Sequence, residues 1–298
     1  MKKVKFKHIL VPVDFGTSSL NALQAAVAMA KLDNATLHLL HVTDTDYDLY
    51  RSDHSVEKPL LPESIGQLMD LAKSIVETNE ISCNHSSLCG NVTYTIIKTA
   101  IELEADLVVM GKNGTADILD DYAGTHTCQV VKKSRIPVLV VPGNTTQYHF
   151  CRILFPLRPL ISVPFKYDAI RPIVLKNAPE ITLLGLRNPD CETELHIISR
   201  LSTMMRLKLR DDGLVFKEQY YFRDNRFAEH IISLTNKNSF DLVVVTSEVT
   251  PEEKYFHLSY FIRKMIHECS IPVLIIYPPF PKISKEELLG RIEKEMVL

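Results

Sequence analysis

The residues best suited to chemistry are the glycines between Val108 and Val131. This segment reads VVMGKNGTADILDDYAGTHTCQVV and holds three of the chain's ten glycines, Gly111, Gly114 and Gly124. Glycine allows positive φ angles and a close approach of the backbone to a ligand. The residues after Gly124 predict a helix start, whose first amides lack intrahelical partners and carry the positive end of the helix dipole. This pattern favours a phosphate-binding site.

Polar side chains at the predicted helix start could add to such a site. Thr125 and Thr127 offer hydroxyl hydrogen bonds to phosphate, and His126 stands between them as a ligand contact or a neighbour of the cap. A Gly-Thr pair before a helix is also a common N-terminal cap, so the same residues have a purely structural interpretation. The P-loop pattern GxxxxGK[ST] does not occur in the sequence, which argues against a P-loop NTPase.

Asp14 is a second candidate because it directly follows an apolar run, HILVPV. A carboxylate at the end of a buried strand costs free energy unless a hydrogen-bond donor compensates it. That donor could be a ribose hydroxyl or an adenine amino group. It could equally be the backbone of the turn that follows, DFGTSS.

The elements that must position these residues alternate between apolar runs and helical patterns. We expect strands at HILVPV, ATLHLLHV, Ile81–Leu88, DLVVMG and PVLVVP, with helices between them, as in the three- and four-residue spacing from Leu20 to Ala30. Continuous Val, Leu and Ile strands indicate a parallel sheet with helices on both faces. The sequence therefore predicts a doubly wound, Rossmann-like α/β fold. Its ligand crevice lies at the carboxyl ends of the strands, where Asp14 and the glycines fall.

Two pairs of similar segments indicate an internal duplication. HILVPVDF is echoed by RILFPLRP, and the pattern of Asp106–Pro142 is echoed at Asp241–Pro278, so that Ile136 and Ile271 stand 135 residues apart. A length of 298 residues suits two domains. We expect α/β domains at residues 1–145 and 150–280 and a helical tail at residues 281–298. In the tail, Ser284 and Glu287 form a capping box.

Composition excludes several classes of protein. The chain is 46% hydrophobic and 23% charged with a formal net charge of −2, which is typical of a soluble globular protein without general affinity for nucleic acid or membrane. No apolar run approaches the roughly 18 residues of a membrane span, and the apolar start breaks at Asp14, too early for a signal peptide. We expect a cytoplasmic protein. Six cysteines without a CxxC pair indicate reduced thiols rather than disulfides or a metal site.

Several segments together resemble the universal stress protein family: ILVPVDF, SSLNAL, LHLLHV and, above all, MGKNG followed after nine residues by GTHTCQVVKKSRIPVLVVP. ATP-binding members of that family carry G-x2-G-x9-G-[ST]. Four residues match this motif in full: Gly111, Gly114, Gly124 and Thr125. The resemblance covers residues 4–143 well and residues 150–278 in weaker form. It implies a tandem, UspA-like member built from two adenine nucleotide alpha hydrolase-like domains.

The resemblance also implies a ligand and its contacts. The ligand would be ATP, with or without Mg²⁺, or another adenine nucleotide, with Asp14 and the backbone near Val42 at the adenosine end. The phosphates would lie against Gly111, Gly114, Gly124, Thr125 and Thr127. Four neighbours complete the expected binding set: Pro12, Met110, Lys112 and His126. The family's last strand commonly forms a dimer edge, which implies that VLVV and VLII pair the two halves within this chain.

Two departures from the family pattern bear on function. The spacer TADILDDYA carries Asp117, Asp120 and Asp121 and no lysine or arginine, and these carboxylates would repel a triphosphate unless they bind Mg²⁺ or project into solvent. In the second copy the pocket motif is lost. Its residues at the motif positions are Thr246, Val249, Ser259 and Tyr260, with Arg158 at the position of Asp14. We expect no nucleotide in the second copy.

The sequence thus predicts a regulatory protein of the stress response that binds an adenine nucleotide in its first domain. No catalytic set is visible in the sequence. Two alternatives stay open: a slow ATPase or autophosphorylating enzyme, and a scaffold that binds no nucleotide. We expect an unidentified protein partner, and a homodimer in addition to the internal pairing is a further option.

Overall fold

The computed structural model describes residues 5–44, 62–112, 126–158, 163–187, 190–222, 226–237, 240–247 and 259–277. The expected tail, Gly114, Gly124, Thr125 and the acidic spacer lie outside these ranges. The described strands are β1 His8–Pro12, β2 Thr36–Thr43, β3 Cys83–Cys89, β4 Leu107–Gly111, β5 Val138–Val141, β6 Arg152–Leu157, β7 Glu180–Arg187, β8 Phe216–Phe222, β9 Leu242–Thr246 and β10 Val273–Ile276. The helices are α1 Thr17–Asp33, α3 Pro62–Asn79, α4 Val92–Glu102, α5 His126–Lys133, α6 Val163–Asn177, α7 Glu192–Asp211, α8 Phe227–Lys237 and α9 Tyr260–Glu268.

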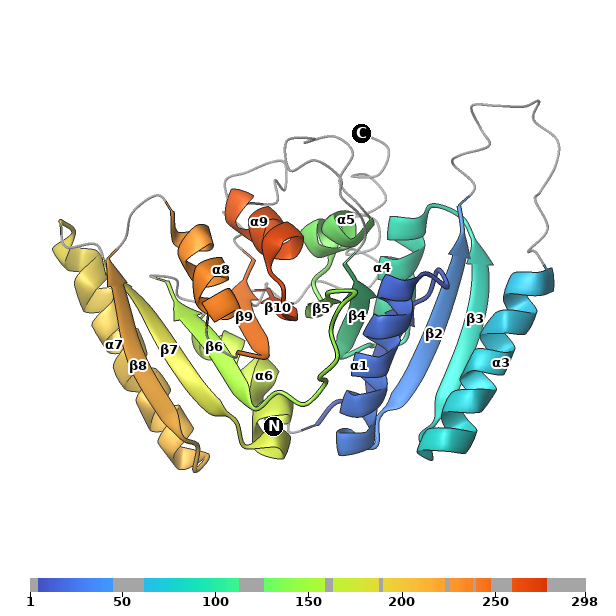
Figure 1. Ribbon diagram of the computed structural model, residues 1–298, viewed down its shortest axis with the longest axis horizontal. Coiled ribbons are helices and arrows are strands. Elements are labelled where there is room, and N and C mark those ends of the chain that lie inside the picture. Colours follow the sequence, from blue (N-terminus) through green and yellow to red (C-terminus); the bar gives the residue numbers. More distant parts are fainter. Residues whose placement is uncertain are drawn as a thin grey trace.

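All the described strands form one sheet, in the order β3-β2-β1-β4-β5-β10-β9-β6-β7-β8 (Figure 1). Strands β1 to β5 make the first half of the sheet and strands β6 to β10 the second half. Both halves have the same strand order, counted from their outer edges to the middle of the sheet. Within each half the neighbouring strands run parallel. The α/β fold class with parallel, doubly wound sheets is confirmed.

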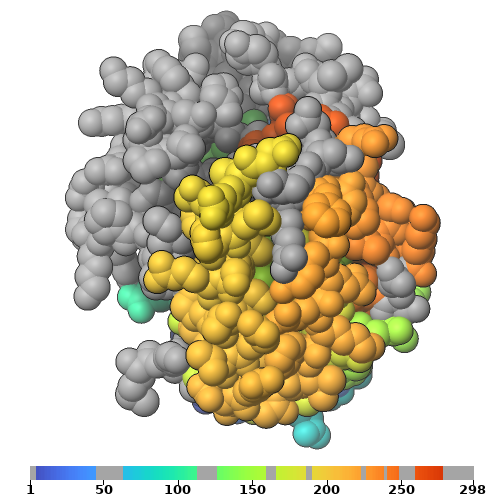
Figure 2. All heavy atoms as spheres, turned by 90° about the vertical axis from the view of Figure 1, so that its left-hand side faces the viewer, coloured from blue at the N-terminus to red at the C-terminus, as the bar shows by residue number. Residues whose placement is uncertain are grey.

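The two halves meet at a seam where β5 and β10 run antiparallel. Val140 pairs with Val273, Leu139 with Leu274, and Val138 with Ile275. The expected pairing of VLVV with VLII is therefore confirmed. These strands are fully buried because helices cover both faces of the sheet at this point. The seam leaves β3 and β8 as the outer edges of the sheet, and Figure 2 views the molecule from the edge formed by α7 and β8.

Each face of the sheet has its own hydrophobic core. Alternate residues of β1 point to opposite faces, so that Ile9 and Val11 pack with α1 and α3 while Leu10 packs with α4 and α5. In the second half, Phe155 of β6 faces α6 and Leu154 faces the core beneath α8 and α9. The continuous apolar strands of the sequence are explained by this burial on two sides. Within the described part of the chain, every helix is too short or too polar to cross a membrane.

A buried lysine distinguishes the second half from the first. Lys166 of α6 is only 2% exposed, and its ammonium donates a 2.8 Å hydrogen bond to the carbonyl of Pro156 and lies 4.0 Å from the centre of the Phe155 ring. Burial lowers the pKa of Lys166 well below its usual value, and the nearby Arg158 acts in the same direction. In the first half the corresponding position, 144 residues earlier, is Ala22.

Candidate functional site

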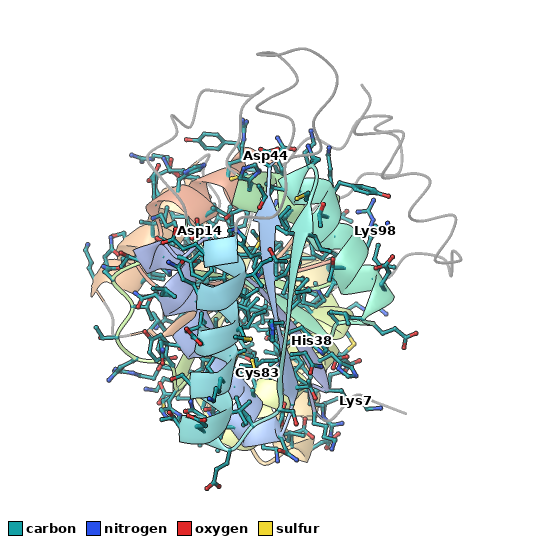
Figure 3. The ribbon with its side chains drawn as sticks, turned by 90° about the vertical axis from the view of Figure 1, so that its right-hand side faces the viewer. Lys7, Asp14, His38, Asp44, Cys83 and Lys98 are labelled. Atoms are coloured by element: carbon teal, nitrogen blue, oxygen red, sulfur yellow. The ribbon has the colours of Figure 1, made fainter. Side chains whose placement is uncertain are left out.

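A cavity of about 290 Å³ opens at the carboxyl ends of β1, β2 and β4. This is the end of the sheet at which open α/β folds bind ligands. Seven of the residues expected from the sequence line it: Pro12, Asp14, Val42, Met110, Gly111, His126 and Thr127. The other lining residues are Val13, Ser19, Leu40, Val92 and Ile96. Figure 3 shows Asp14 and Asp44 toward this end of the sheet and Lys7 toward the opposite end.

Five of the residues that line the cavity form an apolar wall. Leu40 and Val42 project from the same face of β2, and Val92 and Ile96 stand one helical turn apart on α4. Met110 of β4 completes this wall. Leu40, Val92 and Ile96 were not among the residues predicted from sequence, although the spacing of two in a strand and four in a helix was a signal that could have identified them. Such a wall suits the face of a flat, apolar ring.

Asp14 both lines the cavity and caps the turn that begins α1. Its Oδ1 accepts hydrogen bonds from the Gly16 amide, at 2.9 Å, and from the Ser19 hydroxyl, at 2.5 Å. Phe15, between them, adopts a left-handed conformation with a φ of 61°, and its ring lies 5.1 Å from that of His41. The two interpretations of Asp14, ligand contact and turn cap, are therefore compatible in one geometry.

Gly111 is required by packing within the protein. A Cβ atom at this position would lie 2.5 Å from the carbonyl carbon and oxygen of Ser18 and 2.8 Å from the Ser19 amide nitrogen. Such distances are not tolerated, and the atoms concerned are backbone. The end of β4 therefore lies directly against the first turn of α1, which gives Gly111 a structural reason to be glycine beside any contact with a ligand.

Thr127 fastens the start of α5 to the end of β4. Its hydroxyl is buried and donates a 2.9 Å hydrogen bond to the carbonyl of Gly111. The Thr127 hydroxyl, which we expected to donate to a phosphate, therefore donates to a backbone carbonyl in this structure. The contact holds the first turn of α5 beside the cavity, with His126 exposed at its rim.

Among the described residues of the expected binding set, Lys112 is the one that does not line the cavity. Its ammonium donates a 3.3 Å hydrogen bond to the carbonyl of Cys269, the residue that ends α9 in the second half. Burial lowers the pKa of Lys112, and the nearby Glu268 opposes that shift. Lys112 therefore connects the end of β4 to the C-terminus of α9 in the second half.

In the second half, side chains at the cavity positions stack on one another. A shift of 135 residues places Phe227 at the position of Val92 and Phe261 at the position of His126. The two rings are stacked, with centres 5.5 Å apart and an interplanar angle of 11°. The guanidinium of Arg158, the counterpart of Asp14, lies 5.0 Å from the centre of the Phe261 ring. Aromatic and cationic side chains thus occupy the region that forms a cavity in the first half.

Known proteins resemble the first half of the chain in sequence. The family model described as the universal stress protein family matches residues 5–142. Universal stress protein Sll1654 of Synechocystis is 30% identical over 139 residues, which are 47% of this chain and 87% of that protein. The chain belongs to the universal stress protein family. Universal stress protein A homolog of Haemophilus influenzae is 31% identical over 142 residues, 46% of this chain and 96% of that protein.

A solved structure extends the likeness in fold to both halves. A universal stress protein from Archaeoglobus fulgidus superposes with a TM-score of 0.68, covering 91% of this chain and 98% of that one, at 14% identity. At this identity the likeness concerns the fold alone. The family model and the two sequence relatives each cover about half of this universal stress protein, whereas the structural likeness covers nearly all of it.

Proposed function

We propose that this universal stress protein binds one adenine nucleotide in its first half, and that its second half binds none. The observation that carries the proposal is the cavity at the carboxyl ends of β1, β2 and β4, whose lining includes seven residues of the expected binding set. Its apolar residues suit a purine ring, and the start of α5 also lines the cavity, where backbone amides can meet phosphate. The stacked rings of the second half support a single site per chain.

The wider role proposed here is that of a cytoplasmic regulatory protein of the stress response, in which nucleotide occupancy biases the choice of a protein partner. We propose two domains for this role, at residues 1–145 and 150–280, with residues 281–298 as a tail. The equal strand order of the two halves supports this division.

A titration of the whole chain with ATP and Mg²⁺, followed by calorimetry and by thermal shift, tests the proposal. We expect one binding event per chain. The double substitution Val92→Phe and His126→Phe copies the rings of the second half into the cavity, and we expect it to abolish binding while the melting curve stays cooperative. The matched control is Phe227→Val, which makes the reverse change in the second half and should leave the stoichiometry and affinity unchanged.

One observation favours a second candidate, a scaffold that binds no nucleotide. Asp14 already has protein partners for its Oδ1, as a turn cap would. Absence of heat and of any thermal shift with millimolar ATP, ADP, AMP, cyclic AMP and adenosine would support the scaffold and remove the nucleotide proposal.

A further inference from the structure

Large apolar side chains that remain exposed gather at the two outer edges of the sheet. Among the described residues, all but two of them, Leu20 and Tyr260, lie on α3, on β3, on α7 or in residues 215–222, which contain β8. The two most exposed are Phe222, at 67%, and Val215, at 65%, one at the end of β8 and the other directly before it. Exposed apolar groups that gather in one place mark an interaction surface. The edge formed by α7 and β8 (Figure 2) is therefore a candidate for such a surface.

The backbone of β8 is positioned to accept a further strand. β8 is the outermost strand of the second half, with β7 as its one neighbour among the described strands. The carbonyl of Val215 accepts a 3.0 Å hydrogen bond from the Ile181 amide of β7, so the odd-numbered residues of β8 turn their backbone groups toward β7. The even-numbered residues from Phe216 to Phe222 turn theirs outward. Such an edge is a template for pairing with another chain.

The two charged side chains of β8 have partners of opposite charge within the chain. The ammonium of Lys217 lies 2.8 Å from the carboxylate of Glu180, and the carboxylate of Glu218 lies 3.3 Å from the guanidinium of Arg206. The hydroxyl of Tyr220 donates a 3.0 Å hydrogen bond to the other oxygen of Glu218. Charged residues on an edge strand commonly prevent pairing with another chain. On β8 that protection is reduced, because both charges are compensated.

The sequence of β8, FKEQYYF, is complementary to itself when it is read in the opposite direction. A two-fold axis through its middle residue, Gln219, would place no two like charges opposite each other, and it would pair Phe216 with Phe222, Lys217 with Tyr221 and Glu218 with Tyr220 of a second copy. Aromatic pairs of this kind stabilise antiparallel strands. An axis through Lys217 or Glu218 would set two like charges opposite each other, which is destabilising. The axis through Gln219 also aligns the full length of β8 with its copy.

The opposite edge of the sheet lacks this complementarity. β3 reads CNHSSLC and has no phenylalanine or tyrosine, so aromatic pairs across a two-fold axis cannot form there. The aromatic residues of β8 are thus a difference between two strands that hold equivalent places in the two halves. They favour β8 over β3 as the site of association.

We propose that two copies of this chain associate through β8, antiparallel about a two-fold axis at Gln219, so that their sheets form one continuous sheet. The chain already uses this geometry internally, because β5 and β10 join the two halves as an antiparallel pair. An interface of this kind uses the same surface on both copies, as in most protein dimers. The proposal concerns the outer edge of the second half and is independent of ligand binding in the first half.

Gln219→Cys tests the position of the axis by disulfide cross-linking of the whole chain, with copper phenanthroline as the oxidant. The two copies of this residue would form a non-hydrogen-bonded pair with Cα atoms about 4.5 Å apart, within the range of a disulfide. We expect a covalent dimer on a non-reducing gel. Lys217→Cys is the matched control, because its two copies would lie about 14 Å apart, too far to join. The parent chain, with six cysteines, sets the background. A cross-link that forms equally in all three proteins overturns the proposal.

Sedimentation equilibrium from micromolar to submillimolar concentrations tests the association itself. Gln219→Lys would place two ammonium groups opposite each other, and we expect it to raise the Kd of the dimer about tenfold or more. Ser86→Lys is the control on β3, because Ser86 pairs with Leu40 of β2 as Gln219 pairs with Leu184 of β7. It should leave the Kd unchanged. Circular dichroism spectra and thermal melts verify that both variants fold.

Two results would contradict the proposal. A parent chain that stays monomeric at submillimolar concentration overturns it and leaves the edge of β8 to a strand of another protein. A dimer that Ser86→Lys weakens and Gln219→Lys does not would place the interface at β3 instead.

Discussion

The hydroxyl of Tyr277 donates a 2.5 Å hydrogen bond to the carbonyl of Val131, a residue 146 positions earlier in the chain. Tyr277 follows β10 and Val131 lies in α5, so the bond crosses the seam beside the β5–β10 strand pair. Burial raises the pKa of Tyr277 far above its usual value, so the phenol stays protonated and able to donate. The two halves are thus joined by a helix contact as well as by the sheet.

Tyr277→Phe should lower the free energy of unfolding by about 1–2 kcal/mol, because a buried carbonyl loses its donor while the ring is kept. Urea unfolding followed by circular dichroism measures the change. Tyr260→Phe is the control, since Tyr260 is 53% exposed and its hydroxyl lies at the surface, where we expect almost no loss. Equal stability of the Tyr277→Phe variant and the parent would show that this bond does not hold the seam.

Gly111→Ala should destabilise the protein by roughly 3 kcal/mol, because the added methyl group would meet the backbone of Ser18 at 2.5 Å. Gly143→Ala is the matched control. Its added methyl group would lie 3.0 Å from the Ser18 hydroxyl oxygen, which is part of a side chain and can shift, and at an ordinary contact distance of 3.9 Å from the Ser18 Cα. We expect a loss below about 1 kcal/mol there. A thermally stable Gly111→Ala variant would mean that α1 moves away from β4 at little cost.

A destabilised Gly111→Ala variant would be a poor test of ligand binding. A loss of nucleotide binding in a Gly111→Ala variant would report the displacement of α1 as much as the loss of a phosphate contact. Substitutions of Val92 and His126 are better probes, because both side chains line the cavity.

Much of the fold could be predicted from sequence because burial on both faces makes strands such as LVVMG of β4 and VLVV of β5 apolar throughout. The pairing of VLVV with VLII was predicted from the family resemblance. Its antiparallel direction was not predicted, since nothing in the composition of these two strands specifies a direction. The contacts of Lys112 and Thr127 could not be predicted. Lys112 meets a residue 157 positions away and Thr127 a backbone carbonyl, and neither partner carries a sequence signal. The stacking of Phe227 on Phe261 could not be predicted either, because the two residues are far apart in the sequence.

Lys166→Met should stabilise the protein at neutral pH by about 1–2 kcal/mol, because a buried amine without an ion pair among the described residues must either carry an uncompensated charge or give up its proton on folding. The pKa of Lys166 is lowered in the folded state, so between that pKa and about 10.5 the unfolded chain holds the proton that the folded chain has lost. The stability of the parent protein should therefore rise with pH across this window, whereas the variant lacks this contribution.

Chemical unfolding of both proteins at pH 7, 8 and 9 checks this prediction. The difference in the free energy of unfolding between the Lys166→Met variant and the parent should become smaller as the pH rises. Lys176→Met, at an exposed position of the same helix, is the control and should show neither the gain nor the pH dependence. A Lys166→Met variant less stable than the parent at every pH would show that the bond to the Pro156 carbonyl outweighs the cost of burying the amine.

Ser19→Ala should weaken nucleotide binding several-fold and lower stability by about 1 kcal/mol. The Ser19 hydroxyl contacts Oδ1 of Asp14 and lines the cavity, so its loss frees the carboxylate to turn away from the ligand. Ser18→Ala removes a neighbouring hydroxyl that donates instead to the Lys112 carbonyl, outside the cavity. Its cost in stability should be similar, with no change in affinity. Thermal melts and titrations with cyclic AMP on both variants separate the two effects, and an equal loss of affinity in both would mean that α1 as a whole, rather than the position of Asp14, controls the site.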